Sequence, residues 1–179
     1  MKKRSILCFI AICFLVVFSS CLPSASHFLI KNEREVYNRI FQTKISNVEI
    51  KYAGYYYNYH NPYKIFINID IDNKGNDLIL LDTSKLKLKS RHYNLEIIYI
   101  QSTYKKRSTN QNEDNPLIII KPMEKCRIQI YVKAKDSEIR EKNIHPEEIL
   151  QLSFKEIKIG NQIVEVKNIE FVPEYAVKE

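Results

Sequence analysis

Two aspartates, Asp70 and Asp72, open a segment whose spacing matches the start of a calcium-binding loop. Such a loop needs oxygen ligands at its first, third and fifth positions and a bidentate carboxylate at its twelfth. Here the fifth position is Lys74 and the twelfth is Leu81. Because an ammonium group repels a cation, the segment is interpreted as a turn that follows a strand.

Other side chains that catalyse reactions or bind metals are dispersed along the chain. Four histidines show neither the i, i+4 spacing nor the CxxC partners typical of zinc sites. They are His27, His60, His92 and His145. No GxSxG motif or phosphate-binding glycine loop is present, and adjacent Glu147 and Glu148 would point to opposite faces of a strand. We therefore expect a non-enzyme without a metal or other cofactor.

Tyrosines cluster between residues 52 and 63, and this cluster is the strongest candidate for a binding surface. Tyr offers rigid amphipathic area for protein or glycan recognition. It is also common in strands, where part of the set would pack in the core, and both interpretations stay open. If there is no bulge at Gly54, Tyr52 and Tyr56 share one strand face. The candidate binding residues are Tyr55, Tyr56, Tyr57 and Tyr59.

The N-terminal residues are predicted to form a targeting signal. Residues 2–4 are basic, and residues 6–18 form an apolar run without a charge, which is typical of a secretory signal peptide. Ser19 and Ser20 then lead into Cys21. This order resembles the lipobox of bacterial lipoproteins, and the resemblance implies that Cys21 receives the lipid. The alternatives are cleavage without lipid and an uncleaved anchor, although a membrane-spanning helix needs roughly 20 apolar residues.

Charge and cysteine content are consistent with an exported protein that binds no nucleic acid. The formal net charge of +7 falls to +4 without the basic residues 2–4. The other charges are interspersed, whereas a nucleic-acid-binding surface has a clustered basic stripe. Cys126 alternates with Ile128 and Ile130, so we expect its thiol to be buried on an apolar strand face.

Period-two alternation predicts strands from residue 48 onward, most clearly over residues 63–71 and 126–132. Gly160-Asn161 predicts a tight hairpin turn. Residues 102–115 lack apolar periodicity and are expected to form a long exposed loop. Apolar residues at a spacing of four predict a short helix near residues 32–41.

These patterns predict an all-β protein, an antiparallel β-sandwich of about seven to nine strands. The expected organisation is a signal peptide over residues 1–20, a lipidated tether with a short helix over residues 21–45, and the sandwich over residues 46–175.

A second resemblance covers residues 48–134, and its main motif lies in residues 66–88. Their strand, the turn at residues 73–75 and the Leu–Lys alternation that follows are similar to immunoglobulin-like domains of bacterial exported lipoproteins. Those domains often have a Pro-Gly-Glu step before a long strand, and Pro122-Met123-Glu124 is similar, with Met in place of Gly. The resemblance implies an immunoglobulin-like sandwich, and a fold by itself implies no function.

Three hypotheses for function follow. The first is a lipid-anchored, non-catalytic cell-envelope protein whose sandwich binds or braces an envelope partner. The second is a surface adhesin or glycan-binding lipoprotein that uses the tyrosine cluster, and the third is an envelope hydrolase without a recognisable motif. In the first two, the N-terminal lipid holds the protein at the outer membrane or cell surface.

Overall fold

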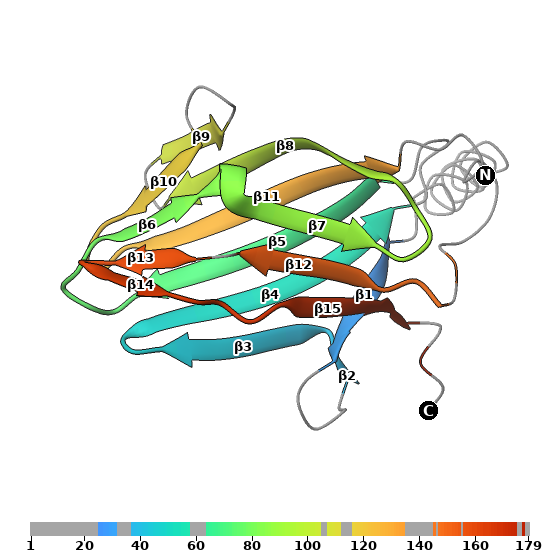
Figure 1. The fold of residues 1–179 in the computed structure, drawn as a ribbon, viewed down its shortest axis with the longest axis horizontal. Coiled ribbons are helices and arrows are strands. Elements are labelled where there is room, and N and C mark those ends of the chain that lie inside the picture. Colours follow the sequence, from blue (N-terminus) through green and yellow to red (C-terminus); the bar gives the residue numbers. More distant parts are fainter. Residues whose placement is uncertain are drawn as a thin grey trace, which may run out of the picture.

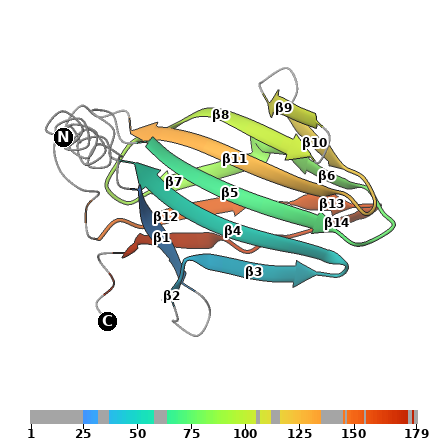
Figure 2. The same ribbon diagram turned by 180° about the vertical axis from the view of Figure 1, so that it is seen from behind.

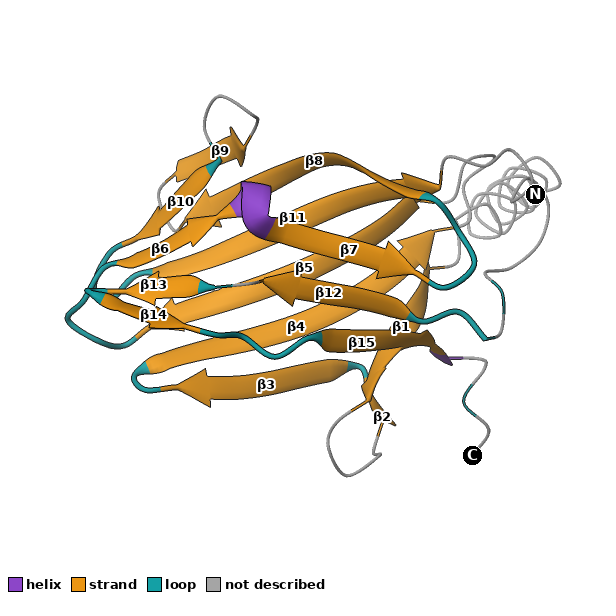
Figure 3. Cartoon of the chain, in the orientation of Figure 1, coloured by secondary structure: helices purple, strands orange, loops and turns teal. Residues whose placement is uncertain are grey.

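The computed structural model describes residues 25–31, 37–57, 64–104, 107–111, 116–134, 145, 147–154, 156–174 and 177. These residues form fifteen strands and one short 3-10 helix, η1 (Thr83–Lys85). Figure 3 colours the strands orange. The strands are β1 (Ala25–Lys31), β2 (Tyr37–Asn38), β3 (Ile40–Ile45), β4 (Val48–Tyr57), β5 (Lys64–Asn73), β6 (Ile79–Asp82), β7 (Leu86–Ser90), β8 (Leu95–Tyr104), β9 (Arg107–Gln111), β10 (Leu117–Ile120), β11 (Lys125–Ala134), β12 (Leu150–Phe154), β13 (Ile157–Ile159), β14 (Gln162–Val164) and β15 (Ile169–Pro173).

The strands form two layers, and every pairing among the described residues is antiparallel. The larger sheet has the order β7-β12-β15-β1-β4-β5-β11-β8-β9, with β2 beside β1 and β3 beside β4. The smaller sheet has the order β10-β6-β13-β14. In Figures 1 and 2, β7, β12 and β15 lie across from β4, β5 and β11, so the larger sheet folds back over itself. The expected all-β antiparallel sandwich is confirmed.

Strand β1 connects the two layers. Its residues from Ala25 to Phe28 pair with β4, and those from Phe28 to Ile30 pair with β15. Figure 1 shows β1 crossing steeply beside the ends of β4 and β15. Backbone hydrogen bonds therefore run without interruption from one layer to the other at this edge.

Alternation along the long strands builds the core between the layers. Ile65, Ile67, Ile69 and Ile71 of β5 are buried, and their partners on β11 are buried with them. Cys126, one of those partners, is 2% exposed, which confirms the expected burial of its thiol.

The tether and short helix expected before residue 46 are wrong where the structure describes that segment. Strands β1 and β3 occupy it, and β3 pairs with β4 along its whole length. Phe41 packs against the core while Ile40 is exposed, so pairing with β4 overrides the local spacing that favours a helix. The sandwich begins at Ala25.

The long exposed loop expected over residues 102–115 is also wrong in its described part. Strand β8 continues through Tyr104, and β9 pairs with it. Ser102 is fully buried in β8, which pairs with a neighbour on each side. The hairpin expected at Gly160-Asn161 is present, with a φ of +57° at Gly160.

Among the described residues, no helix has the length and apolar character needed to cross a bilayer.

Candidate functional site

Side chains that point away from the core on β4, β5, β11 and β8 form rows across the sheet, because directly opposed residues share a face. One row is aromatic. Tyr55 pairs with Phe66, Phe66 with Tyr131, and Tyr131 with Tyr99. These four residues, called the aromatic row below, are partly buried or exposed. The row therefore lies on the outer surface of the sandwich.

The rings of the aromatic row contact one another in sequence. Tyr55 and Phe66 stack with centroids 5.8 Å apart, and Phe66 meets Tyr131 edge to face at 4.7 Å. Tyr131 and Tyr99 stack at 4.0 Å with 21° between their planes. Burial raises the pKa of the Tyr131 hydroxyl, and a hydrogen bond with Tyr99 raises it further. Each ring of the row is thus in contact with at least one other ring.

The aromatic row ends on β8 next to a β-bulge. The register with β11 shifts between Tyr131 and Val132, which leaves Ile98 as the extra residue beside Tyr99. Ile98 is 44% exposed and Tyr99 is 41% exposed. The bulge therefore adds an exposed apolar side chain to the aromatic row.

A row of amides runs alongside the aromatic row. Asn68 pairs with Gln129, and Gln129 pairs with Gln101. The amide nitrogen of Gln129 donates to the Asn68 side-chain oxygen at 3.2 Å, and the Asn68 amide donates to the Tyr55 hydroxyl. This chain of hydrogen bonds connects the amides to the aromatic row and fixes the Tyr55 side chain.

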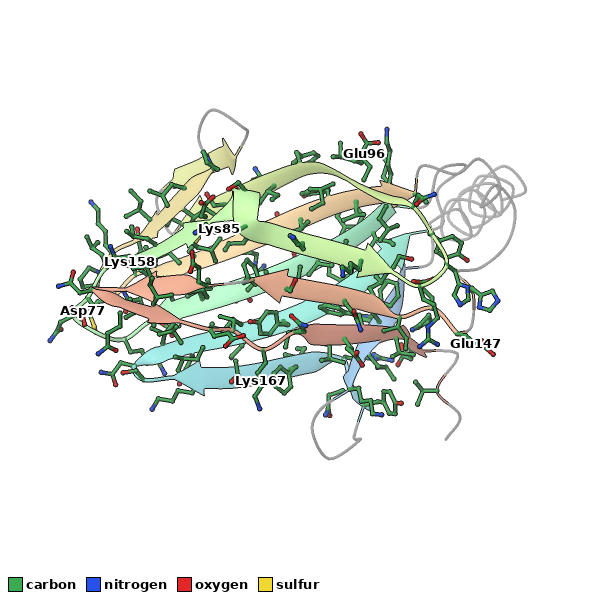
Figure 4. All side chains as sticks on the ribbon, viewed as in Figure 1. Asp77, Lys85, Glu96, Glu147, Lys158 and Lys167 are labelled. Atoms are coloured by element: carbon green, nitrogen blue, oxygen red, sulfur yellow. The ribbon has the colours of Figure 1, made fainter. Side chains whose placement is uncertain are left out.

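Charged side chains flank these two rows, and most of them are paired. Beyond the amides, Arg127 forms a bidentate ion pair with Asp70, with N···O distances of 2.6 and 2.9 Å. The next row contains Lys125 and Asp72, 2.8 Å apart. On the other side of the aromatic row, Lys133 lies 3.3 Å from Glu96, which Figure 4 labels at the upper edge of the molecule. The uncharged rows thus have a charged rim on both sides.

A depression of about 1150 Å³ opens at the Asp70 side of this rim, between β4, β5, β8 and the β10–β11 turn. Its carboxylates have partners: Glu49 accepts from Lys74 at 2.6 Å, and this hydrogen bond lowers the pKa of Glu49. Asp70 and Asp72 hold Arg127 and Lys125. The aspartates that open the calcium-like spacing are therefore engaged in ion pairs.

The tyrosine cluster divides as period two predicts. The register of β4 with β5 is unbroken through Gly54, so there is no bulge there. Tyr52 is buried, and its burial raises the pKa of its hydroxyl, whereas Tyr55 lies in the aromatic row. Tyr56 and Tyr57 have their backbones in β4. The side chains of Tyr56 and Tyr57, all of Tyr59 and all of Cys21 lie outside the described residues.

Sequence reasoning missed the rest of the row and one further cluster. Phe66, Tyr99 and Tyr131 come from three other strands, and only the strand register shows that they adjoin Tyr55. The histidines expected to be dispersed include a pair, His92 and His145, whose rings stack at 4.1 Å.

The geometry combines an ordered aromatic surface, polar hydrogen-bonding groups beside it and a charged rim, and this combination is suited to binding a macromolecule. No protein-family model and no curated protein sequence matches this chain.

Proposed function

We propose that this protein is a lipid-anchored, non-catalytic cell-envelope protein that binds a partner protein through the aromatic row. The observation that carries the proposal is the row itself: four contacting aromatic rings with exposed Ile98 at one end, bordered by amides and then by charges. Protein interfaces have this anatomy, with aromatic side chains enriched and charges depleted at the centre and a polar rim around it. As part of the same proposal, the sandwich is of the immunoglobulin-like type.

Ring packing favours a protein partner over a glycan. Sugars stack on the open face of an aromatic ring, but Tyr131 and Tyr99 cover each other's facing sides at 4.0 Å. Tyr55 and Phe66 are also stacked. A protein surface can instead contact ring edges and hydroxyl groups, as it does at tyrosine-rich antibody surfaces.

The amide row supports glycan binding as a second candidate. Asn68, Gln129 and Gln101 place amide donors and acceptors beside aromatic rings, and sugar hydroxyls require such groups in addition to an apolar surface. Two hydrogen bonds already use part of this capacity, since Gln129 donates to Asn68 and Asn68 donates to Tyr55.

The depression beside the charged rim supports a non-catalytic function over a hydrolase. General acid–base catalysis needs a carboxyl group that can exchange a proton with the substrate. Asp70, Asp72 and Glu49 are each within 2.8 Å of a cationic nitrogen, so their oxygens are engaged in ion pairs.

Replacing the row tyrosines tests the proposal. The triple variant Tyr55→Ser, Tyr99→Ser and Tyr131→Ser should lose capture of the partner by tenfold or more, because central aromatic side chains supply most of the free energy of binding at interfaces. Tyr37→Ser on β2 is the matched control and should capture normally. Capture is measured by affinity purification from solubilised envelopes, followed by binding of the purified partner.

Thermal unfolding of the same variants separates a binding role from a packing role. Partly exposed stacked rings contribute about 0.5–1.5 kcal/mol per pair, so the triple variant should remain folded. If it unfolds, the tyrosines belong to the fold rather than to a binding surface. If a folded triple variant captures the partner normally, the proposed interface loses its support. If the triple variant loses binding to a glycan array but still captures the protein partner, the glycan-binding candidate is favoured.

Cys21→Ala tests the anchor. Without the thiol that accepts the lipid, the protein should move from the detergent phase to the aqueous phase on phase partitioning. Cys126→Ala keeps Cys21 and should stay in the detergent phase, so it serves as the control. Retention of Cys21→Ala in the detergent phase would indicate an uncleaved apolar anchor.

A further inference from the structure

The structure brings two histidines and a glutamate together at one end of the sandwich. His92 lies in the turn between β7 and β8, and His145 and Glu147 precede β12. Their candidate ligand atoms all lie within 4.8 Å of one another, and all three residues are exposed. Figure 4 labels Glu147 at the end opposite Asp77. None of the three residues lines the depression at the charged rim, so the cluster is separate from it.

We propose that His92, His145 and Glu147 form a binding site for a divalent transition metal ion, with Zn²⁺ as the probe. Two imidazole nitrogens and one carboxylate oxygen are a common protein ligand set for zinc, and further coordination positions remain open to water. Imidazole donors favour zinc, copper or nickel, whereas calcium and magnesium prefer oxygen ligands alone.

A buried carboxylate fixes the backbone on which this site is built. Glu148 is fully buried, and its oxygens accept hydrogen bonds from the Ser90 hydroxyl, the Arg91 backbone N–H at 2.9 Å and the His92 backbone N–H at 3.1 Å. The Glu148 backbone N–H in turn donates to the His145 carbonyl at 2.9 Å. The turn that holds His92 and the segment that holds His145 are thus joined through one residue.

A second set of contacts supports the same placement. The Tyr93 hydroxyl accepts from the His145 backbone N–H at 2.7 Å, and the Arg91 backbone N–H donates to the Ile149 carbonyl at 3.2 Å. The His92 and His145 rings lie at 28° to each other. These contacts hold the backbones of His92 and His145 next to each other, so rotation of the two side chains can bring their imidazoles toward a shared ion.

Binding of the ion requires the ligand atoms to move closer together and one hydrogen bond to be lost. Ligand atoms around tetrahedral zinc are about 3.3 Å apart, so the present separation of up to 4.8 Å must shrink. His145 Nδ1 accepts from the Glu147 backbone N–H at 3.1 Å. Coordination through Nδ1 displaces that donor, and coordination through Nε2 moves the ring proton to Nδ1. In either case the ion competes with a single hydrogen bond.

The Arg91 side chain places a cation beside this site. Its guanidinium lies 3.5 Å from the Glu147 carbonyl oxygen and is exposed. Its positive charge lowers the affinity of the site for a cation, but water screens this repulsion because the guanidinium is exposed. The guanidinium occupies no ligand position.

Zinc titration of the full-length protein, untagged and in mild detergent, tests the proposal by calorimetry. The wild-type protein should bind one Zn²⁺ per chain, and His92→Ala and His145→Ala should each weaken binding by about tenfold or more. His27→Ala is the matched control, because His27 is a partly exposed histidine on β1 and lies outside the cluster. It should bind Zn²⁺ like the wild type, and Mg²⁺ should give no saturable binding.

Thermal unfolding gives an independent readout that also shows whether each variant is folded. Zn²⁺ at a hundredfold excess over its Kd should raise Tm of the wild type by about 5–10 °C, and EDTA should reverse the shift. The shift should vanish in folded His92→Ala and His145→Ala. Zinc affinity equal to wild type in both variants, or an equal loss in His27→Ala, would overturn the proposed site.

Discussion

Glu148→Ala should lower the free energy of unfolding by about 3 kcal/mol and is expected to be among the most damaging single substitutions in this protein. The carboxylate is fully buried and accepts hydrogen bonds from the Ser90 hydroxyl and from the backbone N–H groups of Arg91 and His92. Its removal leaves the Ser90 hydroxyl and the His92 N–H without this acceptor, and the Arg91 N–H keeps only the longer bond to the Ile149 carbonyl. Each buried donor left unpaired costs about 1–3 kcal/mol before relaxation. Urea unfolding of the full-length protein in EDTA measures the loss.

Glu147→Ala is the control for this prediction. Glu147 is exposed and precedes Glu148 in the same segment, so its replacement should change stability by no more than about 0.5 kcal/mol. Comparable losses in the two variants would mean that the turn between β7 and β8 is not held by the buried carboxylate. The loss of stability in Glu148→Gln should lie between the losses in Glu147→Ala and Glu148→Ala, because glutamine keeps one acceptor oxygen.

The second large effect is expected at Gly54, where Val should destabilise the protein by about 3 kcal/mol. A Cβ atom at this position would lie 2.9 Å from Cδ1 of Phe171 and 3.4 Å from Cβ of Phe28. Both phenylalanines are fully buried, so neither ring can move into solvent. Overpacking of this kind typically costs about 1–3 kcal/mol, and Val adds two methyl groups beyond the Cβ. Chemical denaturation measures the change.

Ala53→Val provides the comparison at the neighbouring position. Ala53 points to the outer face of β4, beside Asn68, and Val is favoured in strands. The free energy of unfolding of the Ala53→Val variant should therefore stay within about 0.5 kcal/mol of the wild-type value. A Gly54→Val protein as stable as Ala53→Val would show that the β1–β4–β15 contact is looser than the structure indicates.

Sequence reasoning predicted those parts of the fold in which local pattern and tertiary environment agree. Strand β5 has one face toward solvent and one face in the core, so buried isoleucines alternate with more exposed residues along it. The Gly160 turn needs a positive φ that glycine adopts without strain. The turn between β3 and β4 was missed because Ser46 supplies the positive φ there, and serine is not a strong signal for it.

The errors occur where distant strands decide the local structure. The spacing of apolar residues near Ile40 suits a helix, but β4 offers it an open edge with which to pair. Polar β9 pairs as an outer strand beside β8, where no apolar face is required. Alternation could place Tyr55 on the outer face, but Tyr131 and Tyr99 join it only through the register of β4, β5, β11 and β8. Single-sequence periodicity contains no information about that register.

The placement of β1 has a mechanical consequence. In the proposed anchoring, only three residues separate the lipid on Cys21 from Ala25, a reach of at most about 14 Å. Any pull between the membrane and a bound partner would then load β1 first. Because β1 is hydrogen-bonded to β4 on one side and to β15 on the other, a force along the strand would shear both ladders together instead of opening one bond at a time. Resistance to extraction from the membrane side would therefore depend on the unfolding rate of the whole sandwich.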